Sequence, residues 1–378
     1  MEKLIVRTKK DYGKRACLIF LGAFLIVSPS DLFAQQENTN NSETENAAVY
    51  YSKAFDLLEY PQSDAVKAQL KEAVTHGWQK EYEELENILT ENGPCFEELE
   101  KGLKTEKCDF NLGGESKYII DKIIPDARKT RNLSQLLLLK GRHCEQQNNI
   151  DGAIDAYLSS LTFARHISQD NALISRMIAI AIEKEACAPL KQFLESGKAK
   201  SQARLRISGY LKKFEREQFS AKELVESEKD FFISTVKMLA DGVRQRAEKG
   251  AKFNIGKKLA MESLDEELTA NAQESATRYY GNFATAMETN AEKDWEYAVN
   301  EIEALKKSLK DPVSNVKEAG MLLYDSLTRD AAGSRSIIAR KVIKSMLVMA
   351  IPDFKRAAEN YYSTLKDLRE VASLATVD

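Results

Sequence analysis

Hydrophobic side chains recur at helical spacing along most of the chain. From Ala47 onward they return every three or four positions, which is the period of one face of an α-helix. Pro61 and the run Asn92-Gly93-Pro94 interrupt this pattern and are expected to end helices. No segment shows the apolar–polar alternation of a convincing strand. The pattern therefore predicts an all-α fold.

The clearest local unit covers residues 132–166, which read as two helices joined by a turn. Its turn residues are Asn148-Asn149 and Asp151-Gly152. Two small residues and two large ones have the spacing of the tetratricopeptide signature: Leu137, Gly141, Ala153 and Tyr157. The small residues are expected where the helices cross, with the large ones filling the groove between them. Advancing the pattern by about 34 residues gives no second match. The sequence thus predicts one tetratricopeptide-like hairpin, not an array.

The second half is expected to consist of longer helices packed along coiled-coil-like seams. Ser220-x-x-Glu223 and Ser263-x-x-Glu266 have the form of capping boxes, each opening an amphipathic stretch. Asp311-Pro312 has the residue types of an N-cap followed by a first-turn proline. A last helix is predicted after Pro352, where apolar residues alternate by three and four.

The N-terminus has the three parts of a secretory signal peptide. Basic residues, including Lys14 and Arg15, precede an apolar run from Ala16 to Val27, and the small residue Ala34 follows. Twelve helical residues cover about 18 Å, which is short for a hydrocarbon core of about 30 Å. We therefore predict cleavage after Ala34 and an extracytoplasmic protein, either periplasmic or secreted. The alternative is an uncleaved N-terminal anchor.

These patterns divide the chain into four predicted parts. Residues 1–34 are the signal peptide, and the polar residues 35–46 form a flexible leader. Residues 47–218 form a helical-repeat-like domain, and residues 219–378 form a bundle of long helices. No membrane span is expected after signal removal, because no sufficiently long apolar run follows Val27.

Charge argues against nucleic acid as the main partner. Removal of residues 1–34 leaves 49 basic and 55 acidic residues, a formal charge of −6. Basic residues gather at 198–206 and 212–216, with helical spacing or acidic residues around them. We interpret them as solvated helix faces, with phosphate-binding patches as the alternative.

Four cysteines remain after processing, an even number that is compatible with two disulfides in an oxidising compartment. Cys95 and Cys108 flank the least regular stretch, so we predict a disulfide between them. Cys144 and Cys187 lie on predicted helices and are expected to be buried.

Candidate chemistry is sparse. The chain has three histidines, and His143-Cys144 is the only pair with nucleophile-like composition. Helical neighbours point about 100° apart, so these two side chains are not expected to face each other. The sequence matches no phosphate loop, dinucleotide fingerprint or zinc-protease motif. We expect no metal and no cofactor.

Two function classes stay open: a helical module that binds a protein or envelope component, and an all-α lyase or hydrolase using carboxylates and tyrosines.

Three tyrosine doublets stand out: Tyr50-Tyr51, Tyr279-Tyr280 and Tyr361-Tyr362. In a helix, one ring of each pair should enter the core and its neighbour should lie at the boundary. A binding groove is the alternative.

Parts of the chain resemble a family of uncharacterised exported bacterial α-helical proteins with a tetratricopeptide-like hairpin. The resemblance rests on Cys108-Asp109-Phe110, the hairpin at 137–157, Ala172-Leu173-Ile174-Ser175-Arg176, and Ile338-Ala339-Arg340 followed by an apolar helix and Pro352. It implies an extracytoplasmic helical protein, and the family has no assigned activity to transfer.

Overall fold

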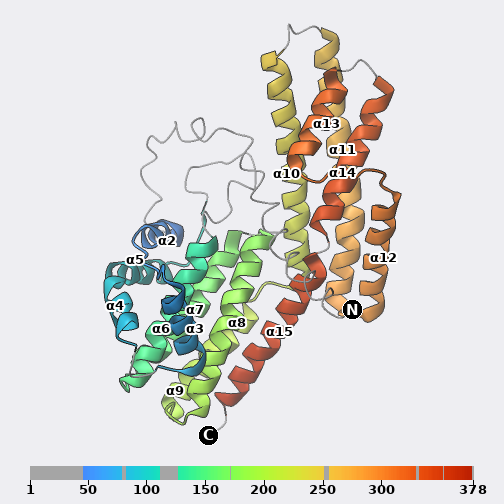
Figure 1. Cartoon of the computed structure of the whole chain (residues 1–378). Coiled ribbons are helices and arrows are strands. Elements are labelled where there is room, and N and C mark those ends of the chain that lie inside the picture. Colours follow the sequence, from blue (N-terminus) through green and yellow to red (C-terminus); the bar gives the residue numbers. More distant parts are fainter. Residues whose placement is uncertain are drawn as a thin grey trace, which may run out of the picture. The chain divides into compact units, whose positions relative to one another are not determined.

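The computed structural model confirms an all-α fold (Figure 1). It describes residues 46–78, 82–110, 127–170, 172–250, 255–328, 332–351 and 353–376. Within these residues no strand forms, and the one β-type pairing is an isolated bridge between Asn46 and Lys107.

The chain forms two compact units. Among the described residues, one unit lies within 46–228 and 355–376, and we call it the hairpin unit. The other lies within 229–354, and we call it the bundle unit. The division into domains 47–218 and 219–378 stays a prediction. The contacts place residues 355–376, the last helix, in the hairpin unit.

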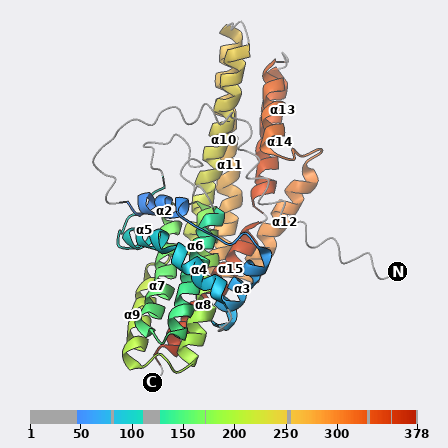
Figure 2. The ribbon, with the colours of Figure 1, turned by 60° about the vertical axis from the view of Figure 1, so that its left-hand side comes forward.

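The hairpin unit is built from short and medium helices (Figure 2). In chain order they are α2 (Ala47–Asp56), α3 (Asp64–His76), α4 (Glu83–Glu91), α5 (Gly93–Leu103), α6 (Ala127–Gln146), α7 (Ile150–Ile167), the 3₁₀ turn η5 (Ser168–Asp170), α8 (Leu173–Glu195), α9 (Ser201–Arg216), the first residues of α10 and most of α15 (Asp353–Leu374).

Helices α6 and α7 form the predicted hairpin, and local chemistry explains its turn. Asn148 has a positive φ of 56°, a conformation that asparagine tolerates. The side chain of Asn149 then accepts a hydrogen bond from the Gly152 backbone N–H at 3.0 Å and caps α7. Tyr157 packs directly over Gly141, where the absent side chain leaves room for its ring. The four signature residues are therefore packing residues, and their tetratricopeptide assignment remains a prediction.

The bundle unit contains the longer helices. They are the remainder of α10 (Ala221–Gly250), α11 (Ile255–Thr289), α12 (Glu292–Ser308), α13 (Val316–Thr328) and α14 (Ala332–Ala350). Aromatic rings occupy its core. The ring centre of Tyr280 lies 5.9 Å from that of Phe232 and 5.3 Å from that of Phe354. The ring centres of Phe283 and Trp295 are 5.9 Å apart.

Two of the four predicted helix starts in the second half are confirmed. Helix α15 begins at Asp353, directly after Pro352. The Glu223 backbone N–H donates to Ser220 Oγ at 3.1 Å, and the Ser220 N–H donates to Glu223 Oε2 at 2.5 Å. This reciprocal pair is the predicted capping box at the start of α10.

The other two predicted starts are wrong. Ser263-x-x-Glu266 lies inside α11, because that helix already begins at Ile255. Asp311 has a positive φ of 51°, and α13 begins later, at Val316. Asn315 replaces it as the cap, because its side chain accepts from the Glu318 N–H at 2.9 Å.

The predicted Cys95–Cys108 disulfide does not form in the structure, where no disulfide links the four described cysteines. Cys95 points from α5 toward α2, where its Sγ donates to the Ala54 carbonyl at 3.2 Å. Burial raises the pKa of this thiol to about 12. Cys95 therefore belongs to the hydrophobic core, together with Cys108.

The predicted signal peptide, its cleavage after Ala34 and the leader lie outside the described residues and stay predictions. Among the helices that are described, none is long and apolar enough to cross a membrane.

Candidate interaction surface on α9

Helix α9 has one face fixed to the hairpin unit and one face open to solvent. Ile207, Leu211 and Phe214 are buried and belong to the same core cluster as Tyr157 of the hairpin. Their spacing of three and four residues places them on one side of the helix.

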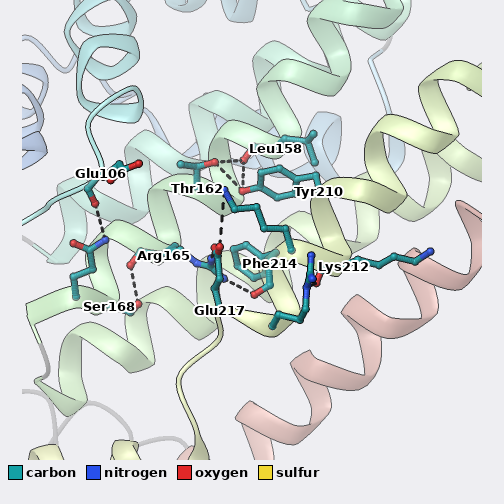
Figure 3. A network of polar contacts seen from close by, with 12 residues as sticks. Glu106, Leu158, Thr162, Arg165, Ser168, Tyr210, Lys212, Phe214 and Glu217 are labelled. Carbon is teal, nitrogen blue, oxygen red and sulfur yellow. Dashed lines mark hydrogen bonds and ion pairs between the residues drawn. The ribbon is translucent and has the colours of Figure 1, made fainter.

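Polar contacts with α7 hold the second half of α9 in place (Figure 3). The Tyr210 hydroxyl lies 2.7 Å from Thr162 Oγ1 and donates to the Leu158 carbonyl at 3.2 Å. Arg165 donates to the Phe214 carbonyl and pairs with Glu217. Its guanidinium also lies 4.3 Å from the centre of the Phe214 ring. The last turn of α9 therefore has a fixed position relative to α7.

Arg204 holds the first half by binding carbonyls at the C-terminal ends of two other helices. It donates to Leu194 of α8 at 2.8 Å, to Leu374 of α15 at 2.6 Å and to Ala199 at 2.9 Å. Carbonyls in the last turn of a helix lack intrahelical donors and carry partial negative charge. One guanidinium thus satisfies two such acceptors and the carbonyl of Ala199 in the loop before α9, and it joins three helices.

We expect Arg204→Met to lower the free energy of unfolding of the hairpin unit by about 2 kcal/mol, because methionine keeps the apolar stem but removes the charged donors. Chemical denaturation followed by circular dichroism would measure the change. Arg216→Met is the matched control, since Arg216 is exposed and donates to the Lys212 carbonyl one turn away in its own helix. Equal effects of the two substitutions would contradict the role assigned to Arg204.

The solvent face of α9 combines basic side chains with an apolar opening. The helix contains five arginines and lysines and one glutamate, in a chain whose net charge is −3. Leu205 is 72% exposed, and a side chain added at Gly209, one turn on, would meet nothing within 4 Å. The face consists of Gln202, Leu205, Arg206, Gly209, Lys212, Lys213 and Arg216, which are all exposed. We call these residues the α9 outer face.

Acidic neighbours engage part of this face only weakly. Arg206 pairs with Asp155 and lies 3.7 Å from Asp151, and Lys213 lies 3.9 Å from Glu217. All of these side chains are substantially exposed, and exposed ion pairs contribute about 0–1 kcal/mol each. A partner carboxylate could therefore replace them at little energetic expense. The predicted solvated helix face holds for part of the basic clusters, since Arg206, Lys212, Lys213 and Arg216 are exposed on one side of α9. Lys198 and Lys200 precede the helix, and Arg204 binds carbonyls of the hairpin unit.

The candidate chemical groups lie elsewhere. His143 packs against Trp78, with ring centres 4.6 Å apart, whereas Cys144 lies beside Gly152. The two side chains therefore do not face each other, as expected. His166 is buried and lies 2.5 Å from the Tyr51 hydroxyl. Burial lowers the pKa of His166 to about 4, so the imidazole is neutral above that pH. No group of His, Cys, Asp and Glu within the described residues could hold a metal ion.

Two of the three tyrosine doublets follow the expectation. Tyr51 and Tyr361 are buried, and their neighbours Tyr50 and Tyr362 are half-buried. In the third doublet both rings are covered. Tyr280 enters the aromatic core, and the Arg278 guanidinium lies 5.2 Å from the centre of the Tyr279 ring. The expectation is wrong there because a long neighbouring side chain covers the outer ring.

Comparisons with known proteins add no family to this picture. No family model matches the chain, and the searches of curated proteins and of solved structures found no significant match.

Proposed function

We propose that this chain is an exported, non-catalytic helical protein that binds an acidic segment of another extracytoplasmic protein through the α9 outer face. The observation that supports the proposal best is the combination of Leu205, 72% exposed, with four exposed cationic side chains on the same face of α9, Arg206, Lys212, Lys213 and Arg216. In a protein–protein interface an apolar side chain at the centre is surrounded by a polar rim, and Leu205 with its charged neighbours has this arrangement. Here the border is basic, so electrostatic complementarity favours an acidic partner.

The fixed inner face of α9 also supports binding. Arg204, Tyr210 and Arg165 hold the helix from three directions, so the outer face is presented without ordering a flexible segment first. Presentation on a rigid element lowers the entropic penalty of association. The chain's net negative charge adds to this argument, because the basic helix differs from the rest of the surface and can orient an incoming acidic partner.

Site-specific photo-crosslinking in envelope fractions would test the proposal. A photoreactive residue at Leu205 should give a discrete crosslinked species, whereas the same residue at Lys71, exposed on α3 of the same unit, should not. The combined change Lys212→Glu, Lys213→Glu and Arg216→Glu should reduce the Leu205 crosslink at least tenfold, because it turns attraction into repulsion.

The control for charge itself is Lys67→Glu with Lys71→Glu on α3, which should leave the crosslink unchanged. The proposal would be contradicted if Leu205 and Lys71 gave equal crosslinking. It would also be contradicted if the three glutamate substitutions on α9 left the Leu205 crosslink unchanged. If the crosslinked species contained lipid and no protein, the partner would be an anionic membrane surface instead of a protein. Turnover of a substrate in a lyase and hydrolase screen, lost on mutation of clustered carboxylates, would favour an enzyme instead.

A further inference from the structure

Helix α15 reaches the hairpin unit from a distant part of the sequence and packs beside α8 and α9. Lys184 Nζ lies 3.2 Å from Ser363 Oγ, and Lys191 Nζ lies 2.5 Å from Glu370 Oε1. Both pairs are 179 residues apart, so α8 and α15 run parallel in a fixed register. Leu368, Val371 and Ala375 complete the contact by joining the apolar cluster of α8 and α9.

Two hydrogen bonds tie α15 to the hairpin unit, from Arg204 to the Leu374 carbonyl at 2.6 Å and from Tyr361 to the Phe219 carbonyl at 2.8 Å. The ion pairs of α15, in contrast, are of the weak, exposed kind. Lys191–Glu370 and Arg369–Glu215 join side chains that are each more than a third exposed. Such pairs contribute about 0–1 kcal/mol. The backbone of α15 makes few close approaches to the described helices around it, whereas α7 packs closely along α6 and α8. Of the elements around α8, α15 is therefore the one that separates at least energetic expense.

A buried carboxyl group lies on α8 near this contact. Glu183 is 1% exposed. Its Oε2 accepts a hydrogen bond from Gln218 Nε2 at 2.9 Å, and its Oε1 has no hydrogen-bond partner among the described residues. Four other titratable groups act on it or are influenced by it: Arg165 from α7, Tyr210 from α9, Tyr361 from α15 and Cys187 from α8 itself. The Tyr361 hydroxyl donates to the Phe219 carbonyl at 2.8 Å.

This environment suits the neutral acid and disfavours the carboxylate. Burial raises the pKa of Glu183 to about 8, while the Gln218 hydrogen bond and the Arg165 charge oppose that shift without overcoming it. Once exposed to water, the same group has a pKa of about 4.3. The closed arrangement therefore binds the proton more tightly than an open one. Its stabilisation is complete below pH of about 4.3, decreases as the pH rises, and is lost by about pH 8.

We propose that Glu183 makes the docking of α15 pH-dependent: loss of its proton drives α15 away from α8 and lets water reach the carboxylate. Acid favours the closed arrangement, and neutral or alkaline pH favours the open one. Because one proton is released when α15 opens, the equilibrium constant for opening can change by at most about tenfold per pH unit. Between pH 6 and pH 8 the opening constant of α15 should thus rise by between about tenfold and a hundredfold.

Hydrogen exchange of the full mature chain, analysed by mass spectrometry, would test this. Peptides from residues 355–376 should lose protection between pH 6 and pH 8 after correction for intrinsic exchange, while α6 peptides keep theirs. Glu183→Gln keeps the shape and the Gln218 contact but cannot ionise, so its α15 protection should be independent of pH. Glu195→Gln, an exposed change on the same helix, should behave as wild type.

A second variant separates titration from folding. Gln218→Met removes the donor that favours the charged form, so the plateau of the opening equilibrium should move to higher pH. Equal pH dependence in wild type and Glu183→Gln would overturn the proposal. It would also fail if α15 stayed protected at pH 8, or if α6 and α15 lost protection together, because Glu183 would then act on the whole unit.

Discussion

Replacing Arg142 by methionine is expected to lower the free energy of unfolding of the hairpin unit by about 3–5 kcal/mol, the range measured for breaking one partner of a buried ion pair. Arg142 is 3% exposed on α6. Its Nη1 lies 3.0 Å from Glu145 Oε1, its Nε donates to the Val74 carbonyl at 3.0 Å, and its Nη2 donates to Gln192 at 2.5 Å.

The large effect comes from what the substitution leaves behind. Glu145 is 8% exposed, and without Arg142 its carboxylate keeps the Tyr157 hydroxyl as its side-chain donor. The Val74 carbonyl and the Gln192 side chain lose a charged donor at the same time. An uncompensated buried charge is far more destabilising than the absence of the pair.

Denaturant unfolding of Arg142→Met would measure the loss, with Arg131→Met as the matched control. Arg131 is on the same helix and pairs with Glu185, but its side chain is 50% exposed, so its replacement should change stability by less than about 1 kcal/mol. The double variant Arg142→Met with Glu145→Leu should recover part of the loss, because it removes both charges. A loss below about 1 kcal/mol for Arg142→Met would show that the pair is solvated.

Adding a single methyl group at Gly141 is expected to destabilise the hairpin unit by about 1–3 kcal/mol, the usual range for overpacking a core. The Cβ of Gly141→Ala would lie 2.4 Å from Cε1 and 2.8 Å from Cζ of Tyr157. Tyr157 is fully buried and donates to Glu145, so its ring cannot move without breaking that hydrogen bond. The clash outweighs the gain of about 1 kcal/mol that alanine brings over glycine inside a helix.

Gly209→Ala is the matched control and should have the opposite sign. Gly209 is also inside a helix, but a Cβ there meets nothing within 4 Å. It should stabilise the unit by about 0.5–1 kcal/mol through helix propensity alone. Thermal or denaturant unfolding of the two variants measures both effects, and stabilisation by Gly141→Ala would contradict the packing. Combined with Tyr157→Leu, Gly141→Ala should lose most of its penalty, because the ring that it meets is gone.

Local patterns predicted those parts of the fold whose interactions are close in sequence. The hairpin of α6 and α7 follows from the helical period on each side of Asn148-Asn149, and the start of α10 follows from Ser220 and Glu223. The basic stretch at 198–216 was equally visible, but the sequence does not show that Leu205 is exposed among its side chains. Sequence reasoning also missed Glu183, because it is the first of three consecutive charged residues on α8 and resembles a solvated helix face.

Sequence by itself thus determined the helical class, the hairpin and its turn, and the poverty of catalytic groups, because helix period, capping and composition depend on neighbouring residues. Tertiary structure alone decided two other features. Cys95 lies in the core against Ala54 instead of pairing with Cys108, and α15 packs beside α8 at an offset of 179 residues. Each depends on which side chains from distant parts of the sequence are buried together. Such long-range packing produces no periodic pattern in the local sequence, so it could not be predicted from that pattern.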